Sequence, residues 1–339
     1  MCRLMLKNVT KTFGKTVAVN NLSFNCKEGE TIVLLGPTGA GKTTTLRCIA
    51  GLEELDNGEI YIDNNKLGGI EPENRQVAMF FENYALYPHM TVAENISFPL
   101  KAPMRKGQYS REDIDRKTKE IAQLLQMEDF LYRKPSQLSG GQKQRTALGR
   151  ALIRSPKVFL LDEPIAHLDA VLRNRMRGEM KRIFSQIQST VVYVTHDYRE
   201  ALSIGDQILI MNRGGIVQSG TGTEIYTRMK NMFVAKLVGD PPMNFVAAKL
   251  ISSGGRLFLE IGNGVLTFYD GGLPGLEDWI DSDVTMGVRP HDIQIHEYEG
   301  RNCLNAKLLA IEPISSDYEI TVELVNGKIL KVKSTENHS

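Results

Sequence analysis

The first part of the chain contains short apolar runs separated by glycine and polar residues. Residues 4–9 and 17–24 have the length of short strands around turns. The continuous apolar run Thr31–Leu35 ends at a glycine, which predicts a buried strand. Residues 58–63 alternate between polar and apolar types, so we expect a half-buried strand there. Further buried strands are predicted at residues 158–161, 191–195 and 207–211.

Helical spacing appears between these runs. In residues 111–127 the apolar positions 114, 121, 124 and 125 recur at helical intervals, and Ser110 is a suitable N-cap. A second helix is expected to start at Ser139 and to bury Ala147, Leu148, Ala151 and Leu152. Since strands alternate with helices, the pattern predicts a largely parallel α/β sheet.

The pattern changes after Asp240-Pro241-Pro242. From Phe245 onward, alternating strands and glycine turns follow, without a convincing helix. Val325-Asn326-Gly327-Lys328 is a strong hairpin signal of the Asn-Gly type. We therefore expect two domains, residues 1–238 and residues 239–339, the second being an all-β, barrel-like module.

Composition narrows the class of protein. The 339 residues carry 41 Lys and Arg against 40 Asp and Glu, so net charge does not suggest a nucleic-acid surface, and no nucleic-acid partner is expected. The four cysteines are scattered, which argues against a zinc site or a disulfide scaffold. No signal pattern begins the chain, and no apolar run approaches the roughly 18 residues that span a bilayer. If the protein serves a membrane, it must dock onto a partner that spans it.

A phosphate-binding loop follows the run Thr31–Leu35. Its sequence, Gly36-Pro37-Thr38-Gly39-Ala40-Gly41-Lys42-Thr43, matches GxxxxGK[ST], and the helix-like residues 44–50 begin with Thr44. The glycines let backbone N–H groups surround the phosphates, and the helix presents its positive end to them. Lys42 is expected to reach the β- and γ-phosphates, and Thr43 to hold Mg²⁺. ATP and Mg²⁺ are the cofactors that this loop predicts.

Two adjacent acids, Asp162 and Glu163, end a predicted buried strand. Open α/β sheets bind ligands at the carboxyl ends of their strands. Asp162 is therefore a candidate Mg²⁺ ligand through water, and Glu163 a candidate general base for the attacking water. Considered alone, such a pair is often a surface strand end; its position after a phosphate loop favours the catalytic interpretation.

Ser139-Gly140-Gly141-Gln142 allows two interpretations. It is formally a capping box, S-x-x-Q. The same serine hydroxyl, free glycine amides and helix N-terminus also make an anion site. Because the Lys42 pocket already covers one side of a triphosphate, a second anion site on the same chain would be superfluous unless it serves another molecule.

These motifs together resemble the ATP-binding-cassette (ABC) ATPases over the whole first domain. The resemblance implies a P-loop α/β domain with a helical subdomain at about residues 91–155, followed by an OB-like β module. It also implies a head-to-tail homodimer in which Ser139 of one copy caps the γ-phosphate bound by the other, so that the Ser139 hydroxyl and the glycine amides are idle in the monomer. Leu168-Asp169 matches the loop that crosses the dimer interface.

Two further residues gain a role from the resemblance. Phe13 matches the aromatic that stacks on adenine, while for a lone phenylalanine core packing is the competing interpretation. His196, in Tyr-Val-Thr-His-Asp, matches the histidine that contacts the γ-phosphate and would join Glu163 in catalysis. Without the motif order, a histidine at a strand end would be structural.

Three segments are similar to the ATPase subunits of binding-protein-dependent sugar importers of the maltose and multiple-sugar type. They are Tyr84-Ala85-Leu86-Tyr87-Pro88-His89, Pro241-Pro-Met-Asn-Phe245 and Gly287-Val-Arg-Pro-His-Asp292. The resemblance implies that Tyr84–Pro88 lies beside the groove for a transmembrane permease subunit, at the cytoplasmic face of the membrane, with an extracytoplasmic solute-binding protein as an indirect partner. The β module would contact the β module of the partner copy and would receive regulatory proteins.

The chain departs from the family at three points. Glu82 replaces a glutamine that touches Mg²⁺, and its charge is expected to disfavour closure around ATP unless it is protonated or metal-bound. Ala166, followed by His167, replaces a serine of the crossing loop. Relatives usually continue beyond the strand at 328–333, so we expect an incomplete barrel.

Other functions remain open at this point. Glycerol-phosphate, polyamine and iron importers share much of the layout, so the motifs predict the mechanism without singling out the solute. A weakly hydrolysing nucleotide-sensing subunit is compatible with Glu82 and Ala166. A soluble ABC ATPase that acts on nucleic acid or ribosomes is opposed by the near-neutral charge and by the docking-like segment.

Overall fold

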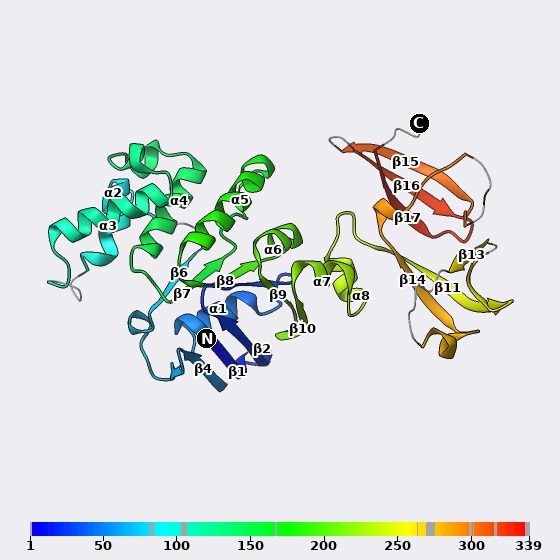
Figure 1. Cartoon of the computed structure of the whole chain (residues 1–339), viewed down its shortest axis with the longest axis horizontal. Helices are drawn as coiled ribbons and strands as arrows, with labels where there is room; N and C mark the ends of the chain where they lie inside the picture. Colours follow the sequence, from blue (N-terminus) through cyan, green and yellow to red (C-terminus); the bar gives the residue numbers. More distant parts are fainter. Residues whose placement is uncertain are drawn as a thin grey trace. The chain divides into compact units, whose positions relative to one another are not determined.

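The computed structural model describes residues 2–81, 85–102, 107–166, 168–262, 264–268, 275–297, 300, 302–314 and 317–335. The chain forms two compact units, Met1–Lys230 and Asn231–Ser339 (Figure 1). The predicted boundary near residue 238 stays a prediction.

A six-stranded sheet forms the centre of the first unit. Its strands lie in the order β10-β9-β3-β8-β7-β6, and all neighbours are parallel except the antiparallel edge pair β9 and β10. The bounds are β3 Thr31–Leu35, β6 Val77–Phe80, β7 Val158–Asp162, β8 Thr190–Thr195, β9 Gln207–Asn212 and β10 Gly215–Gly220. The predicted parallel sheet and its buried strands are confirmed.

A second, antiparallel sheet has the order β2-β1-β4-β5. It consists of β1 Cys2–Phe13, β2 Thr16–Lys27, β4 Asn57–Ile62 and β5 Asn65–Lys66. The first helix, α1 Lys42–Ala50, shares one core with both sheets: Leu6 of β1, Leu46 of α1 and Leu34 of β3 are all buried in it. Burial of each such side chain contributes roughly 1.5–3 kcal/mol. The core therefore fixes where the first turn of α1 meets the end of β3.

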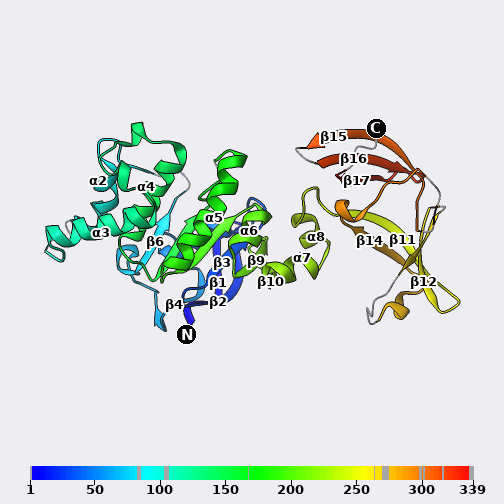
Figure 2. The ribbon, with the colours of Figure 1, turned by 45° about the horizontal axis from the view of Figure 1, so that its top comes forward.

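Three helices, α2 Val92–Ser97, α3 Arg111–Leu124 and α4 Gly140–Leu152, group together beside the six-stranded sheet (Figures 1 and 2). Ser110 caps α3 and Ser139 caps α4, as expected, and both do so through a complete capping box. Ala147, Leu148 and Leu152 are buried, as predicted, whereas Ala151 is half-buried.

The longest helix among the described residues, α5 Ala170–Gln186, packs beside α6 Tyr198–Ile204 (Figure 2). Our strand-and-helix assignment did not include it, although Met176, Met180, Ile183 and Phe184 form a buried stripe at helical spacing. Phe184 meets Tyr193 of β8 edge-on, with ring centroids 6.3 Å apart. Two short helices complete the set, α7 Gly222–Thr227 and α8 Met232–Leu237.

The second unit is built on two antiparallel sheets around their own core. The strand orders are β13-β12-β11-β14 and β15-β16-β17. The bounds are β11 Asn244–Ser253, β12 Arg256–Ile261, β13 Gly264–Phe268, β14 Asp283–Val288, β15 Ala306–Ile314, β16 Asp317–Leu324 and β17 Ile329–Ser334. Val246, Ile320 and Val332 of the two sheets share the core. The Asn326-Gly327 hairpin joins β16 to β17, with Gly327 at φ 78°.

No helix among the residues that the structure describes is both long enough and apolar enough to cross a membrane.

Candidate functional site

The phosphate loop lies between β3 and α1, and two of its glycines have no room for a side chain. A Cβ on Gly36 would lie 2.4 Å from the Met211 carbonyl oxygen, and one on Gly41 would lie 2.2 Å from the Ala18 carbonyl oxygen. Gly41 also has φ 99°. Glycine at these positions therefore lets the loop backbone pack directly against the backbone at Met211 and Ala18. All of the predicted residues Gly36, Pro37, Thr38, Gly39, Ala40, Gly41, Lys42, Thr43 and Thr44 lie on this one loop and helix start.

Lys42 is folded back into the loop. Its Nζ donates to the Gly36 carbonyl oxygen at 2.8 Å and to the Pro37 carbonyl oxygen at 2.9 Å. Burial lowers the pKa of Lys42, while the charges of Glu163 and Asp162 act in the opposite direction. An ammonium group has three protons to donate, so the two loop carbonyls leave capacity for a phosphate oxygen.

Thr43 and Asp162 come from distant parts of the chain and meet beside the loop. The Thr43 hydroxyl donates to Asp162 Oδ1 at 3.0 Å. Hydroxyl and carboxylate oxygens are ligands that Mg²⁺ prefers, and Mg²⁺ takes only one or two of them from a protein while keeping waters and phosphate oxygens. The pair therefore fits a magnesium ion that also binds nucleotide. Within the described residues no group of three or more His, Cys, Asp or Glu side chains could hold a metal without such help.

Glu163 and His196 face each other at the ends of β7 and β8. His196 Nδ1 lies 2.9 Å from Glu163 Oε2. Glu163 has φ 44°, a left-handed conformation that costs roughly 1–2 kcal/mol in a residue with a side chain. Its N–H donates to the Val194 carbonyl oxygen at 3.1 Å, which helps to hold this sharp turn. Strain of this kind is typical of functional sites.

Phe13 ends β1 with 47% of its surface exposed, so it does not pack in a core. The Nζ of Lys11 lies 5.2 Å from the centre of its ring. An exposed ring at a strand end can stack on a flat ligand such as a purine.

The Ser139 cluster caps its own helix. The Gln142 N–H donates to Ser139 Oγ at 3.4 Å, and the Ser139 N–H donates to Gln142 Oε1 at 2.9 Å. The expectation that the Ser139 hydroxyl is idle in the monomer is therefore wrong, because its oxygen accepts a hydrogen bond; its proton can still be donated. No hydrogen bond or ion pair within the described part of the chain joins residues 139–142 to the phosphate loop.

The predicted crossing loop, residues 166–169 and here called the crossing loop, connects the double acid to α5. The Leu168 side chain is buried with Ile165 and Met176, and Asp169 caps α5 by accepting from the Leu172 N–H at 2.9 Å. His167 lies outside the described residues.

The predicted docking segment, here called the docking segment, is described from Ala85 to Pro88; Glu82 and Tyr84 lie outside the described residues. The buried amide of Asn95 holds this segment. Its Oδ1 accepts from the Tyr87 N–H at 2.9 Å, and the two protons of its Nδ2 are shared among three carbonyl oxygens, of Tyr87, Met90 and Thr91, at 3.0–3.1 Å. Arg150 of α4 donates to the Ala85 carbonyl oxygen at 2.6 Å, and its guanidinium lies 5.3 Å from the centre of the Tyr87 ring.

A cleft of about 450 Å³ lies beside the docking segment. Tyr87, Phe81, Phe98 and Pro99 give it an apolar wall, and Arg150 and Arg154 add positive charge. Sequence reasoning missed Asn95 and Arg150. The signal for Asn95 was a polar residue on the apolar face of a short helix, and Arg150 offered none.

Comparisons with known proteins match both units. The ABC transporter family profile matches residues 19–166, and a profile described as the MalK OB fold domain matches residues 239–293. The chain is 44% identical to a trehalose/maltose import ATP-binding protein, MalK, of Thermococcus litoralis, over all of this chain and 92% of that protein. It is 40% identical to the oligosaccharides import ATP-binding protein MsmX of Bacillus subtilis, over 96% of this chain and 89% of that one.

A solved structure is also similar: an ATP-binding cassette in a dimeric, post-hydrolysis state bound to ADP and Pi. It is 33% identical, has a TM-score of 0.56, and covers 64% of this chain and 98% of its own.

Proposed function

The chain belongs to the ABC transporter family of ATP-binding proteins, and from this membership we propose that it is the ATP-hydrolysing subunit of a binding-protein-dependent sugar importer. The observation that carries the proposal is the convergence of Lys42, Thr43, Asp162, Glu163 and His196 at one edge of the sheet, in a chain similar along its whole length to a sugar-import ATP-binding protein.

In this proposal the phosphate loop holds the triphosphate of ATP. Backbone N–H groups of residues 38–44 and the Lys42 ammonium neutralise its charge, and Phe13 stacks on adenine. Thr43 and Asp162 would hold Mg²⁺, with Glu82 as the third expected oxygen donor. The Mg²⁺ supplies charge for the transferred phosphoryl group.

Hydrolysis needs a proton acceptor for the attacking water. The Glu163 carboxylate takes that proton while the water oxygen bonds to the γ-phosphorus and the bond to the β–γ bridging oxygen breaks, which releases ADP and phosphate. His196, at 2.9 Å from Glu163, orients this carboxylate and donates to the γ-phosphate. The left-handed turn at Glu163 aims the carboxylate toward His196.

Two copies pack head to tail in the proposed active form. Ser139, Gly140, Gly141 and Gln142 of one copy then complete the phosphate site of the other, and residues Leu168 and Asp169 cross between the copies. The capping box supports this role, since the Ser139 proton and the first amides of α4 belong to a helix N-terminus that favours anions. The dimeric state of the similar cassette supports it as well.

Tyr84, Ala85, Leu86, Tyr87 and Pro88 would dock onto transmembrane permease subunits, which places the protein at the cytoplasmic face of the membrane. The apolar cleft beside Tyr87 fits an amphipathic helix from such a subunit. An extracytoplasmic solute-binding protein would deliver the sugar. We propose residues 1–238 as the nucleotide-binding domain and residues 239–339 as the regulatory and dimerisation domain.

The variant Glu163→Gln tests the hydrolytic part. It keeps the shape of the side chain but cannot accept the proton, so ATP should remain bound and hold a stable dimer, with turnover reduced by at least about 100-fold, in the range of general-base contributions. Turnover is measured by phosphate release, and dimer mass by light scattering with ATP and with ADP. Normal hydrolysis in this variant would remove Glu163 from its role.

The transport part is tested with the same tagged protein recovered from membranes. Permease subunits should co-purify, and a solute-binding protein loaded with sugar should stimulate ATP turnover more than the empty one. Recovery without any membrane partner would contradict the importer role and would leave the ATPase assignment intact.

A further inference from the structure

Arg173 lies one turn into α5 and binds the loop that precedes the helix. Its Nη2 donates to the Ala166 carbonyl oxygen at 3.1 Å and to the Leu168 carbonyl oxygen at 3.0 Å. Both acceptors are backbone groups of the crossing loop, which begins three residues after Glu163. One guanidinium therefore spans the loop between the double acid and the start of α5.

The Arg173 side chain is partly buried beside a small apolar cluster. Its Nε is buried and has no hydrogen-bond partner within the described residues. Beside it, Leu168 and Leu172 pack with Ile165 and Met176 in a small apolar cluster. A buried donor without a partner is unfavourable. The two carbonyl contacts are therefore made in spite of a local cost.

The charge of Arg173 also reaches the elements that carry His196. Burial raises the pKa of Glu200, the buried carboxyl of α6. Hydrogen bonds from Thr195 and Tyr193 act against that rise, and the positive charge of Arg173 adds a smaller effect in the same direction. Glu200 accepts from the Tyr193 hydroxyl of β8 at 3.0 Å, and α6 begins two residues after His196. Arg173 thus combines two hydrogen bonds to the crossing loop with a charge interaction on the His196 side of the site.

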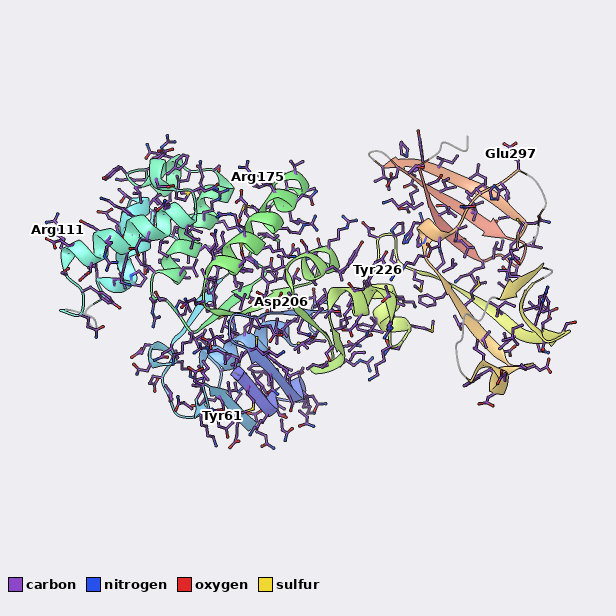
Figure 3. The ribbon with its side chains drawn as sticks, in the orientation of Figure 1. Tyr61, Arg111, Arg175, Asp206, Tyr226 and Glu297 are labelled. Atoms are coloured by element: carbon purple, nitrogen blue, oxygen red, sulfur yellow. The ribbon has the colours of Figure 1, made fainter. Side chains whose placement is uncertain are left out.

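By contrast, the other arginines of this helix have different partners. Arg175 is 71% exposed and pairs with Glu179 on the same helix (Figure 3). Arg177 donates to Asn174, also on α5. Arg182 donates to the Leu124 carbonyl oxygen at the end of α3. Among the described arginines of α5, only Arg173 binds the crossing loop.

We propose that Arg173 is a positioning residue, which holds the crossing loop in the conformation that the two-fold ATP-bound dimer requires. This inference rests on the proposed head-to-tail dimer. A loop whose carbonyls are already bound by its own chain loses less conformational freedom when the partner copy arrives. Because the dimer is two-fold, both loops contribute, and loss of Arg173 weakens both crossings at once.

The test uses the full-length Glu163→Gln protein, in which ATP holds the dimer, and adds Arg173→Ala. The dimer dissociation constant is measured by analytical ultracentrifugation with ATP. We expect it to rise at least tenfold, while the affinity of the dilute monomer for a fluorescent ATP analogue stays within twofold. The matched control, Arg177→Ala, removes an arginine one turn further along the same helix and should leave both values within twofold.

Arg173→Lys separates charge from geometry. Lysine keeps the positive charge but lacks the planar guanidinium, so the dimer of this variant should be weaker than that of the Glu163→Gln parent and tighter than that of the Arg173→Ala variant. With Glu163 intact, Arg173→Ala should lower kcat with little change in KM for ATP.

Each other outcome overturns the proposal. An unchanged dimer in Arg173→Ala would show that the loop does not need this contact. A parallel loss of monomer ATP affinity and of thermal stability would make Arg173 an ordinary folding residue; if the alanine variant does not fold, an unchanged dimer in Arg173→Lys decides against the proposal. Failure of the Glu163→Gln parent to dimerise with ATP would refute the proposed dimer itself, and that result is visible before Arg173 is changed.

Discussion

Arg75 connects the end of the phosphate-loop helix to the segment before β6, and its removal is a sharp test of how the site is supported. Its Nη1 donates to the Cys48 and Ile49 carbonyl oxygens at 3.0 and 3.2 Å, at the C-terminal end of α1, and its Nε donates to the Ile70 carbonyl oxygen at 2.8 Å. Helix C-termini favour positive charge. Arg75→Ala should therefore loosen the helix that carries Lys42 and Thr43.

The magnitude follows from these contacts. Hydrogen bonds to charged groups contribute about 1.5–3 kcal/mol each when buried. Arg75 is half-buried, so water replaces part of what is lost. We expect a total loss of about 3 kcal/mol for the three bonds. At about 2–4 °C per kcal/mol for a unit of this size, the unfolding midpoint should fall by about 6–12 °C.

Substitution of Gly51 tests whether the Arg75 guanidinium lies over this glycine. It caps α1 at φ 81°, and a Cβ there would lie 2.4 Å from the Arg75 Cζ. Gly51→Ala should cost about 1–2 kcal/mol from the left-handed backbone alone, and more when Arg75 is present, because the guanidinium must move. In a double-mutant cycle the two substitutions should therefore couple by about 2 kcal/mol.

The assay can separate the two units. Far-UV circular dichroism follows the helices α1 to α6, all in the first unit, while the single tryptophan, Trp279, reports on the second. The dichroism midpoint should fall and the tryptophan midpoint should not. Equal effects of Gly51→Ala with and without Arg75 would refute the reasoning, since the guanidinium would then not lie over Gly51.

Two further predictions concern buried polar groups. Burial raises the pKa of Glu200 above its unfolded value, so the cost of its charge is absent at low pH and appears as pH rises through the folded pKa. Over that range Glu200→Gln should gain stability relative to the native chain, by about 1.4 kcal/mol per unit of pKa difference. Parallel dependences of the two free energies of unfolding on pH, measured with urea, would contradict this. Asn95→Ala removes the bonds that hold the docking segment and should cost about 2–4 kcal/mol. The second variant, Asn95→Asp, keeps the acceptor for the Tyr87 N–H but loses the donor to the three carbonyl oxygens. Both variants should reduce stimulation of ATP turnover by membrane subunits, and full stimulation in the alanine variant would argue against this segment as the docking site.

Local patterns in the chain were sufficient for much of the first unit and for one hairpin of the second. The buried strands, the caps Ser110 and Ser139, and the Asn326-Gly327 hairpin each depend on a few neighbouring residues, so their signals survive without knowledge of the fold. Helix α5 was missed, although Asp169 and a buried stripe mark it, because its remaining positions are mostly polar.

The sequence by itself determined the phosphate loop, the double acid and the helix caps, because backbone sterics and hydrogen-bond spacing act within one turn of the chain. Only the tertiary structure decided that Thr43 meets Asp162, that Glu163 lies 2.9 Å from His196, and that Arg75, Arg150 and Arg173 bind backbone carbonyls of α1, the docking segment and the crossing loop. These contacts depend on the strand order β10-β9-β3-β8-β7-β6, which places the ends of β3, β7 and β8 side by side. A long arginine can reach many carbonyls, and which of them it binds is settled by packing between segments far apart in the chain.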